Sequence, residues 1–233
     1  MNNGNARNMK PPREAAITHF KGLLQGCPPP SATTPRPELK RQPVELSDTE
    51  FQSALSSLKT RKAVGPDCLA AETFIYADAT TKSVLRSMIE GILNGNAIPE
   101  SWCESTLWPI YKKGDPENPA NYRGIAVGNA IYKLLAIVIS GRLRKFAEER
   151  HVLPETQNGF RANRSTVDSI FILSQCVQQA LALPKGKLFA LFVDFKTAFD
   201  CVNRKLLFAR LRKIGTPEYL VMAIESLYDR TSY

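Results

Sequence analysis

The stretch LFALFVDFKTAFDCVNRKLL, residues 188–207, is the most informative part of this amino-acid sequence. Its first eight residues form an apolar run that is interrupted only by Asp194. Apolar runs of this length are typical of strands buried on both faces, so we expect a buried strand at 188–195. A carboxylate in such a strand is costly unless it has a partner, which makes Asp194 the first candidate functional residue.

Asp194 has two interpretations on the residues alone. An aspartate at the end of a strand often caps the turn that follows. Asp194 and Asp200 could instead serve a Mg²⁺ site, because magnesium prefers carboxylate oxygens together with substrate phosphates. One strand-end carboxylate is not a two-metal site, which holds two ions about 4 Å apart and needs further carboxylates.

The rest of the chain is predicted to be rich in helices, with one basic β-hairpin. Ser47 and Glu50 have the spacing of a capping box, and Ser165 and Asp168 repeat that pattern. Helices are expected over 47–58, 70–77, 82–93, 129–149, 165–183 and 204–214, and from Pro217 onward. The hairpin is expected to pair strands 107–111 and 122–127 around the polar loop 112–121.

The amino-terminal residues 1–43 differ from the rest in composition. They hold eight prolines and few large apolar residues. Proline removes a backbone donor and disfavours helix at the residue before it. We therefore expect 1–43 to be a disordered linker or tail, with a short helix around 15–24 as the alternative.

Charge and cysteine usage narrow the class of protein. The sequence has 31 Lys+Arg against 22 Asp+Glu, a net charge of +9, and a pI near 9.4. A pI above about 9 is expected of a nucleic-acid binder, although many basic proteins bind none. Five scattered cysteines without a Cys-x-x-Cys pair argue against a disulfide framework and a zinc site. With no apolar membrane span or signal peptide, we expect a nuclear or cytoplasmic protein and no membrane partner.

Four blocks of sequence, taken in order, carry a family resemblance. They are KAVGPDCLAAETF (62–74), STLWPIYKKGDPENPANYRGIAVGNAIYKLLAIVISGRL (105–143), LPETQNGFRANRSTVDSIF (153–171) and VDFKTAFDCVNR (193–204). They resemble, in turn, four parts of reverse transcriptases: the amino-terminal extension, the fingers hairpin with its helix, the block that follows that helix, and the first catalytic motif. The resemblance is strongest to LINE-type, non-LTR retrotransposons and weaker to group II intron maturases.

The resemblance implies an α+β fold, the fingers and partial palm of a right-hand polymerase. This reverse transcriptase fold is helix-rich, with a basic β-hairpin and an incomplete palm sheet. It implies three parts: a Pro-rich linker or tail at 1–43, the amino-terminal extension and fingers at 44–186, and a partial palm at 187–233.

Catalytic roles follow from the same resemblance. Asp194 matches the first metal-binding aspartate, and the carbonyl of Phe195 sits where family members offer a backbone ligand to the second of two Mg²⁺ ions. Phe199 matches the aromatic position that packs against the sugar and excludes ribonucleotides. Its alternative is a core aromatic, and both can hold together.

Nucleotide and template contacts are also implied. Arg123 matches the arginine that grips the incoming triphosphate, and Lys112 or Lys113 matches the lysine opposite it. Arginine offers phosphate a planar fork and lysine a compact charge, whereas on charge alone these residues would form a solvated hairpin tip. Template and nucleic-acid contacts are expected of Asn158, Gly159, Phe160, Arg161, Arg164, Arg142, Arg144 and Lys145.

The family's second and third catalytic aspartates are missing from this sequence. They belong to an aromatic-Ala-Asp-Asp motif downstream of the first, and no such motif follows Asp194. We expect the amino-terminal part of a polymerase whose complete form uses RNA template, DNA primer, dNTP and two Mg²⁺ ions, and which is inactive alone. The alternatives are a non-catalytic nucleic-acid-binding or regulatory protein derived from a retroelement, and a group II intron maturase-like RNA-binding fragment.

Overall fold

The computed structural model describes residues 10–24, 43–195 and 197–229, which fall into two units. Unit 1 comprises Met1–Arg142 and Phe199–Tyr233, and unit 2 comprises Leu143–Ala198. The elements in chain order are α1 (Arg13–Leu24), α2 (Asp48–Ser56), α3 (Ala71–Ile75), α4 (Ala79–Leu93), η2 (Glu100–Trp102), β1 (Ser105–Tyr111), η3 (Pro119–Asn121), β2 (Tyr122–Gly128), α5 (Ala130–Glu149), α6 (Thr166–Ala182), α7 (Arg204–Lys213) and α8 (Glu218–Asp229). The expected helix-rich α+β character is confirmed at this level.

The core of unit 1 is formed by apolar side chains from helices far apart in the sequence. Polar contacts then tie these helices together. The Tyr132 hydroxyl on α5 donates to the carbonyl of Leu227 on α8 at 2.8 Å. The Arg212 guanidinium on α7 pairs with Glu218 and Glu225 of α8, which raises the pKa of Arg212. The core side chains buried most completely are Leu46, Phe51, Ile89, Leu93, Ile98, Leu134, Leu135, Leu220 and Val221.

The two predicted capping boxes have different outcomes. In unit 2, the hydroxyl of Ser165 accepts from the Asp168 amide, and the Asp168 carboxylate accepts from the Ser165 amide, so this box is complete. In unit 1, Ser47 accepts from the Glu50 amide at 3.2 Å. The Glu50 carboxylate does not return to Ser47, because it pairs with Arg142 instead.

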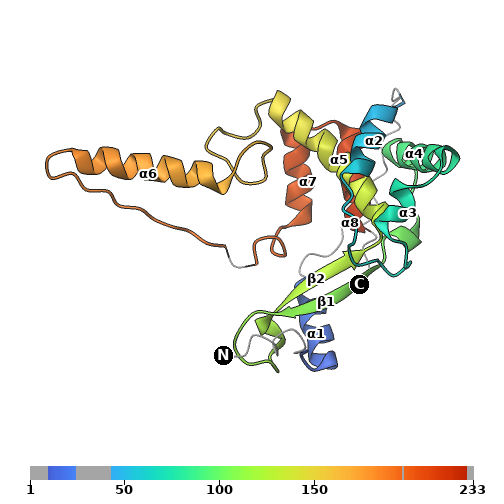
Figure 1. The fold of residues 1–233 in the computed structure, drawn as a ribbon, viewed down its shortest axis with the longest axis horizontal. Helices are drawn as coiled ribbons and strands as arrows, with labels where there is room; N and C mark the ends of the chain where they lie inside the picture. The colour runs from blue at the N-terminus through green and yellow to red at the C-terminus, as the bar shows by residue number, and fades with distance from the viewer. Residues whose placement is uncertain (1–9, 25–42, 196, 230–233) are drawn as a thin grey trace. The chain divides into compact units, whose positions relative to one another are not determined.

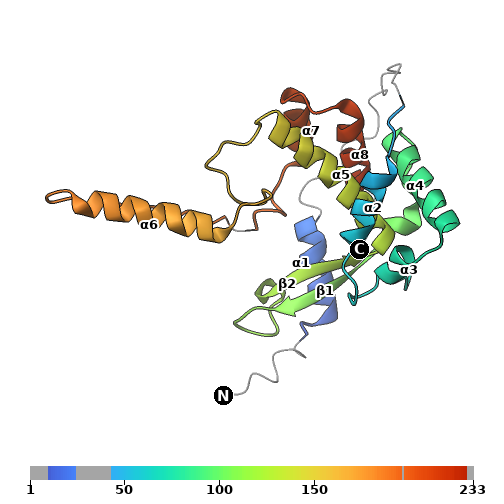
Figure 2. The same ribbon diagram turned by 45° about the horizontal axis from the view of Figure 1, so that its top comes forward.

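The predicted hairpin is confirmed. β1 and β2 pair antiparallel over their full length, from Ser105 opposite Gly128 to Tyr111 opposite Tyr122. Helix α1, which was the alternative for part of the 1–43 segment, lies beside this hairpin (Figures 1 and 2). The rest of that segment, residues 1–9 and 25–42, lies outside the described residues.

The predicted buried strand at 188–195 is wrong in this structure. Residues 187–195 have no regular secondary structure, and the exposed fraction of Phe189 is 90% and that of Leu191 is 89%. A strand needs a neighbour for its backbone hydrogen bonds, and the one sheet among the described residues is β1–β2. The apolar pattern was recognised correctly, but no described segment provides the partner that it requires.

Helix α6 of unit 2 shares this exposure. Its apolar side chains include Val167, Ile170 and Phe171, which are 69%, 66% and 62% exposed. A helix that is apolar around most of its circumference usually lies in the core of a larger protein. Within the described residues, no helix has the length and apolar character needed to cross a bilayer.

Candidate functional site

The β1–β2 hairpin has two faces of different character. Side chains alternate along a strand, and the register places Ile110 opposite Arg123 and Trp108 opposite Ile125 on one face. This front face is open: Trp108 is 51% exposed, Ile110 54% and Ile125 39%. The Arg123 side chain is also exposed, and no ion pair within the described residues engages it. The front face therefore combines one available guanidinium with three apolar side chains.

The loop at the tip of the hairpin is held by its own hydrogen bonds. The Lys112 amide donates to the Asn121 carbonyl at 2.8 Å, which extends the ladder by one step. The Tyr111 hydroxyl donates to Gly114 at 2.6 Å, and the Tyr122 hydroxyl donates to Pro116 at 2.7 Å. Burial raises the pKa of Tyr122, so its phenol keeps the proton that it donates.

This geometry distinguishes the two lysines at the tip. Alternate residues of a strand lie on the same face, so Lys112 follows Trp108 and Ile110 on the front face. The extra hydrogen bond to Asn121 continues the strand geometry as far as Lys112. Lys113 has the opposite parity. Both side chains are exposed, but Lys112 is the better placed to act on the same side of the hairpin as Arg123.

The base of the hairpin is anchored by Asn129, which was not predicted as important. Asn129 is only 1% exposed and lies between β2 and α5. Its side-chain amide donates to the Ser101 carbonyl at 2.6 Å, and its oxygen accepts from the Asp67 amide at 3.3 Å. A Cβ on Gly65 would lie 2.1 Å from that oxygen, so only glycine fits. Gly65 and Asp67 belong to the recognised 62–74 block, but nothing in the sequence pairs them with Asn129.

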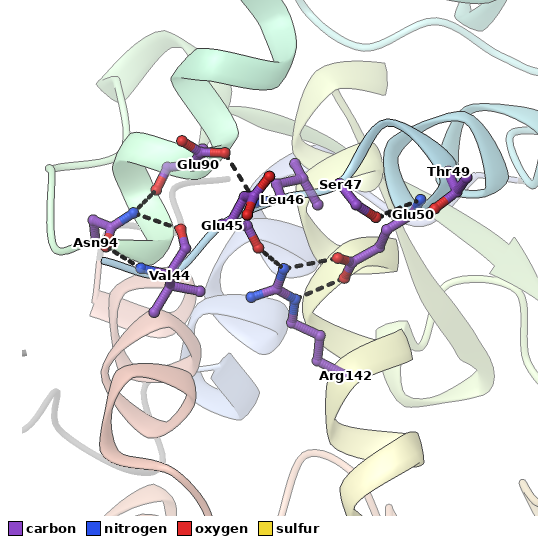
Figure 3. Close-up of polar contacts among 9 residues, drawn as sticks. All are labelled: Val44, Glu45, Leu46, Ser47, Thr49, Glu50, Glu90, Asn94 and Arg142. Atoms are coloured by element: carbon purple, nitrogen blue, oxygen red, sulfur yellow. Dashed lines mark hydrogen bonds and ion pairs between the residues drawn. The ribbon is translucent and has the colours of Figure 1, made fainter. Parts of the chain in front are cut away.

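Arg142, expected to contact nucleic acid, lies in a cluster of polar contacts within unit 1 (Figure 3). Its guanidinium donates twice to the Glu50 carboxylate, at 2.6 and 2.7 Å, and once to the Glu45 carbonyl at 2.7 Å. The hydrogen bonds to Glu50 raise the pKa of Arg142. With a side chain only 14% exposed, Arg142 joins α5 to α2 and to the segment before it, and has little freedom to reach a phosphate.

The same cluster fixes the segment before α2 to α4. The Asn94 side chain exchanges two hydrogen bonds with the backbone of Val44, both at 2.8 Å, and the Glu90 carboxylate accepts from the Leu46 amide at 2.9 Å (Figure 3). Residues 44–46 are therefore held in place by hydrogen bonds, and Leu46 is fully buried in the core of unit 1.

Arg161 and Arg164 of unit 2 are paired with carboxylates as well. Arg161 donates to Glu148 at 2.8 and 3.0 Å and to the carbonyl of Pro154 at 3.1 Å, and its side chain is 8% exposed. Arg164 pairs with Glu155. These hydrogen bonds lower the pKa of Glu148 and of Glu155. Both arginines thus stabilise the loop before α6.

Apart from Asn158, which is half-buried, the remaining predicted template contacts of unit 2 are exposed. Phe160 is 88% exposed and has a positive φ of 64°, and Gly159 lies beside it. Arg144 is exposed, and Lys145 forms only a long pair with Glu149, at 3.9 Å and with both side chains largely exposed. Of the predicted basic contacts, Arg144 and Lys145 are therefore the most accessible.

The predicted catalytic residues do not form a metal site. Asp194 and Phe195 are exposed in unit 2, and Phe199 is 78% exposed in unit 1. In the described part of the chain, no three His, Cys, Asp or Glu side chains gather closely enough to hold a metal ion. The other four carboxylates of unit 2 are engaged elsewhere: Glu148, Glu149, Glu155 and Asp168. These residues do not fit a pair of Mg²⁺ ions, which needs several carboxylates together.

Comparison with known proteins decides the family. A family model described as "Reverse transcriptase (RNA-dependent DNA polymerase)" matches residues 110–233. The chain belongs to the reverse transcriptase family. The match includes β2, the whole hairpin tip, all three candidate triphosphate contacts and the Asp194 motif. The family predicted from the resemblance is confirmed, and the match contains the 153–171 and 193–204 blocks and most of the 105–143 block.

Individual reverse transcriptase relatives come from retrotransposons. The chain is 30% identical over 182 residues to a "Probable RNA-directed DNA polymerase from transposon BS" of Drosophila melanogaster, covering 78% of this chain and 20% of that protein. It is 35% identical over 156 residues to the corresponding protein of transposon X-element, covering 66% and 17%. It is 25% identical over 173 residues to the R2 polyprotein of Popillia japonica, covering 74% and 23%. The chain thus spans about a fifth of the length of these relatives.

Proposed function

We propose that this chain contributes the nucleotide-gripping fingers of an RNA-directed DNA polymerase of a non-LTR retrotransposon. The observation that carries the proposal is the front face of the hairpin, where Arg123 and Lys112 share one side and no described acidic side chain neutralises them. A guanidinium and an ammonium placed in this way suit the oxygens of a triphosphate. The neighbouring Trp108 and Ile125 offer apolar surface to a base.

The complete enzyme would copy an RNA template from a DNA primer, using dNTP and Mg²⁺. In this proposal residues 44–186 form the amino-terminal extension and fingers, and residues 187–233 form a partial palm. Asp194 and the Phe195 carbonyl would then hold metal, and Phe199 would select the sugar. Two-metal transfer needs carboxylates in addition to Asp194, and among the described residues no three His, Cys, Asp or Glu side chains gather to hold a metal ion. We therefore propose that residues 1–233 bind nucleotide without joining it to a primer.

Cross-linking of a photoreactive deoxynucleoside triphosphate to the 233-residue chain tests the nucleotide site. We expect Arg123→Ala to weaken binding roughly tenfold to a hundredfold, because hydrogen bonds to charged groups contribute about 1.5–3 kcal/mol. Lys112→Ala should weaken it less, and Lys113→Ala is the matched control. Equal binding by wild type and Arg123→Ala would contradict the proposal.

A second candidate is a nucleic-acid-binding protein without catalysis, which is favoured by the exposed, basic Arg144 and Lys145. Retention of RNA at increasing salt tests it. Charge reversal at Arg144 and Lys145 should weaken retention and flatten its salt dependence, because phosphate contacts release counterions. Arg123→Ala should leave bulk retention unchanged. Tight RNA binding combined with no triphosphate binding would favour this second candidate.

A further inference from the structure

Helix α1 presents an apolar stripe in a part of the chain that was expected to be a tail. Phe20 is 6% exposed, whereas Ile17, three residues earlier in the helix, is 44% exposed. Phe20 has three half-buried neighbours on the helix: the adjacent His19, Ala16 four residues before it, and Leu23 three residues after it. In a short helix from a polar segment, one buried aromatic ring indicates that the ring packs at a specific site.

The site of the Phe20 ring is the back face of the hairpin, where Gly124 leaves room for it. A Cβ on Gly124 would lie 2.8 Å from Cε1 of Phe20 and 3.2 Å from a methyl group of Leu107. Glycine at position 124 is therefore the residue that lets the ring lie against the strand. The helix also lies against η3, which leads into β2 (Figure 2).

The hairpin needs such a cover. A two-stranded hairpin alone is at best marginally stable in water and requires further strands or a packed helix. Among the described residues the sheet has no third strand, and the front face is open. Packing of α1 on the back face supplies what the hairpin lacks. Because α1 precedes residue 110, it lies outside the family match, yet it covers a hairpin whose tip and β2 strand lie within that match.

We propose that α1 is a brace for the nucleotide-gripping hairpin, with Phe20 as its positioning residue. Phe20 does not touch the ligand. It holds β2, and with it Arg123 and Lys112, in the geometry that a triphosphate requires. The positioning role rests on the proposed nucleotide function, whereas the bracing itself does not.

Hydrogen exchange of the full 233-residue chain tests the brace. In Phe20→Ala, we expect amides of β1 and β2 to lose protection about tenfold to a hundredfold, because truncating a buried aromatic removes packing that holds the helix in place. Amides of α5 and α8 should be unchanged. Phe20→Leu should restore most of the protection, and Ile17→Ala, which truncates a more exposed apolar side chain of the same helix, is the matched control. Unchanged hairpin protection in Phe20→Ala would overturn the inference.

Triphosphate cross-linking of the same variants separates the two claims. If both hold, Phe20→Ala weakens binding about tenfold and Phe20→Leu restores it, whereas Arg123→Ala weakens binding without loss of hairpin protection. Hairpin protection lost in Phe20→Ala with unchanged affinity would overturn the positioning role. If the wild-type chain binds no triphosphate, the proposed function fails, and the exchange experiment alone still decides whether α1 braces the hairpin.

Discussion

The β1–β2 hairpin and the 188–195 segment are both predicted strands, yet only the hairpin forms. The strands of the hairpin are separated by a ten-residue loop, 112–121, and pair along their full length. The 188–195 segment is more apolar, but Phe189, Leu191 and Phe192 are 90%, 89% and 79% exposed. Hydrophobicity therefore does not decide which of the two becomes a strand.

The difference lies in what each segment needs in order to form. The hairpin alternates between faces, so one helix on its back face is sufficient cover, and its backbone partner is close in sequence. A run that is apolar on both faces needs neighbours along its edges and layers on both sides. Those requirements are non-local, and the described residues do not meet them.

Gly65→Ala would disrupt the contact with Asn129 at the base of the hairpin, and it should cause the largest loss in the free energy of unfolding. The added methyl group would meet Asn129, including its backbone at 2.7 Å, so the turn or the start of α5 must shift. We expect a loss of about 3 kcal/mol, the upper range for overpacking a tight site. Urea unfolding would measure it. Gly141→Ala, which has open space, should be neutral or slightly stabilising, and an equal loss in both variants would contradict this account.

Arg142→Met tests the cluster that joins α5 to the segment before α2. Removing charged hydrogen bonds to a partly exposed carboxylate should cost about 2 kcal/mol in the free energy of unfolding. Lys145→Met, in the same helix, removes only a long exposed pair with Glu149, and should cost less than about 0.5 kcal/mol. If the two variants were equally stable, Arg142 would be available for nucleic acid as first expected.

Acid should loosen the loop before α6 without unfolding the hairpin. Arg161 and Arg164 lower the pKa of Glu148 and Glu155 in the folded state, so their contribution is present above the ordinary value of 4.5. It is lost as the pH falls through the lowered folded values. We expect amide protection at 155–164 to fall as the pH drops below 4.5, before that of β1–β2. Simultaneous loss in both regions would contradict separate stabilisation.

Phe192→Lys should have the smallest effect on stability and a clear effect on association. An exposed side chain contributes little to folding, so the free energy of unfolding should change by less than about 0.5 kcal/mol. Exposed apolar segments promote aggregation, and a charge should reduce the self-association seen by light scattering. Tyr122→Lys, at a position 2% exposed, is the destabilising control. A monodisperse wild-type monomer at high concentration would contradict the premise.

Local signals in the sequence were sufficient for most of the fold. Periodicity and capping residues predicted α2, α4, α5, α6, α7 and α8, with Ser165–Asp168 capping as expected. Contacts between distant residues were beyond that reasoning. Glu50 leaves its capping box for Arg142, 92 positions away, and the 188–195 segment depended on partners that no local pattern could supply.

The candidate site was only partly predictable. The resemblance selected Arg123 and the two lysines, and the alternation of β1 could have placed Trp108 and Ile110 on the same face as Lys112. The resemblance also suggested Arg142, Arg161 and Arg164 for nucleic acid, but the structure pairs their charges with glutamates. Which basic residue meets a carboxylate depends on the tertiary fold. Phe20 and Asn129 carried no sequence signal beyond being an aromatic and an asparagine.

The most direct test of the central claim, nucleotide binding without catalysis, is primer extension by residues 1–233. A purified chain would be given an RNA template, an annealed DNA primer, labelled dNTP and Mg²⁺. The account predicts no incorporation, because Asp194 alone cannot hold two ions in working geometry. Template-dependent DNA synthesis that is lost in Asp194→Asn would contradict it.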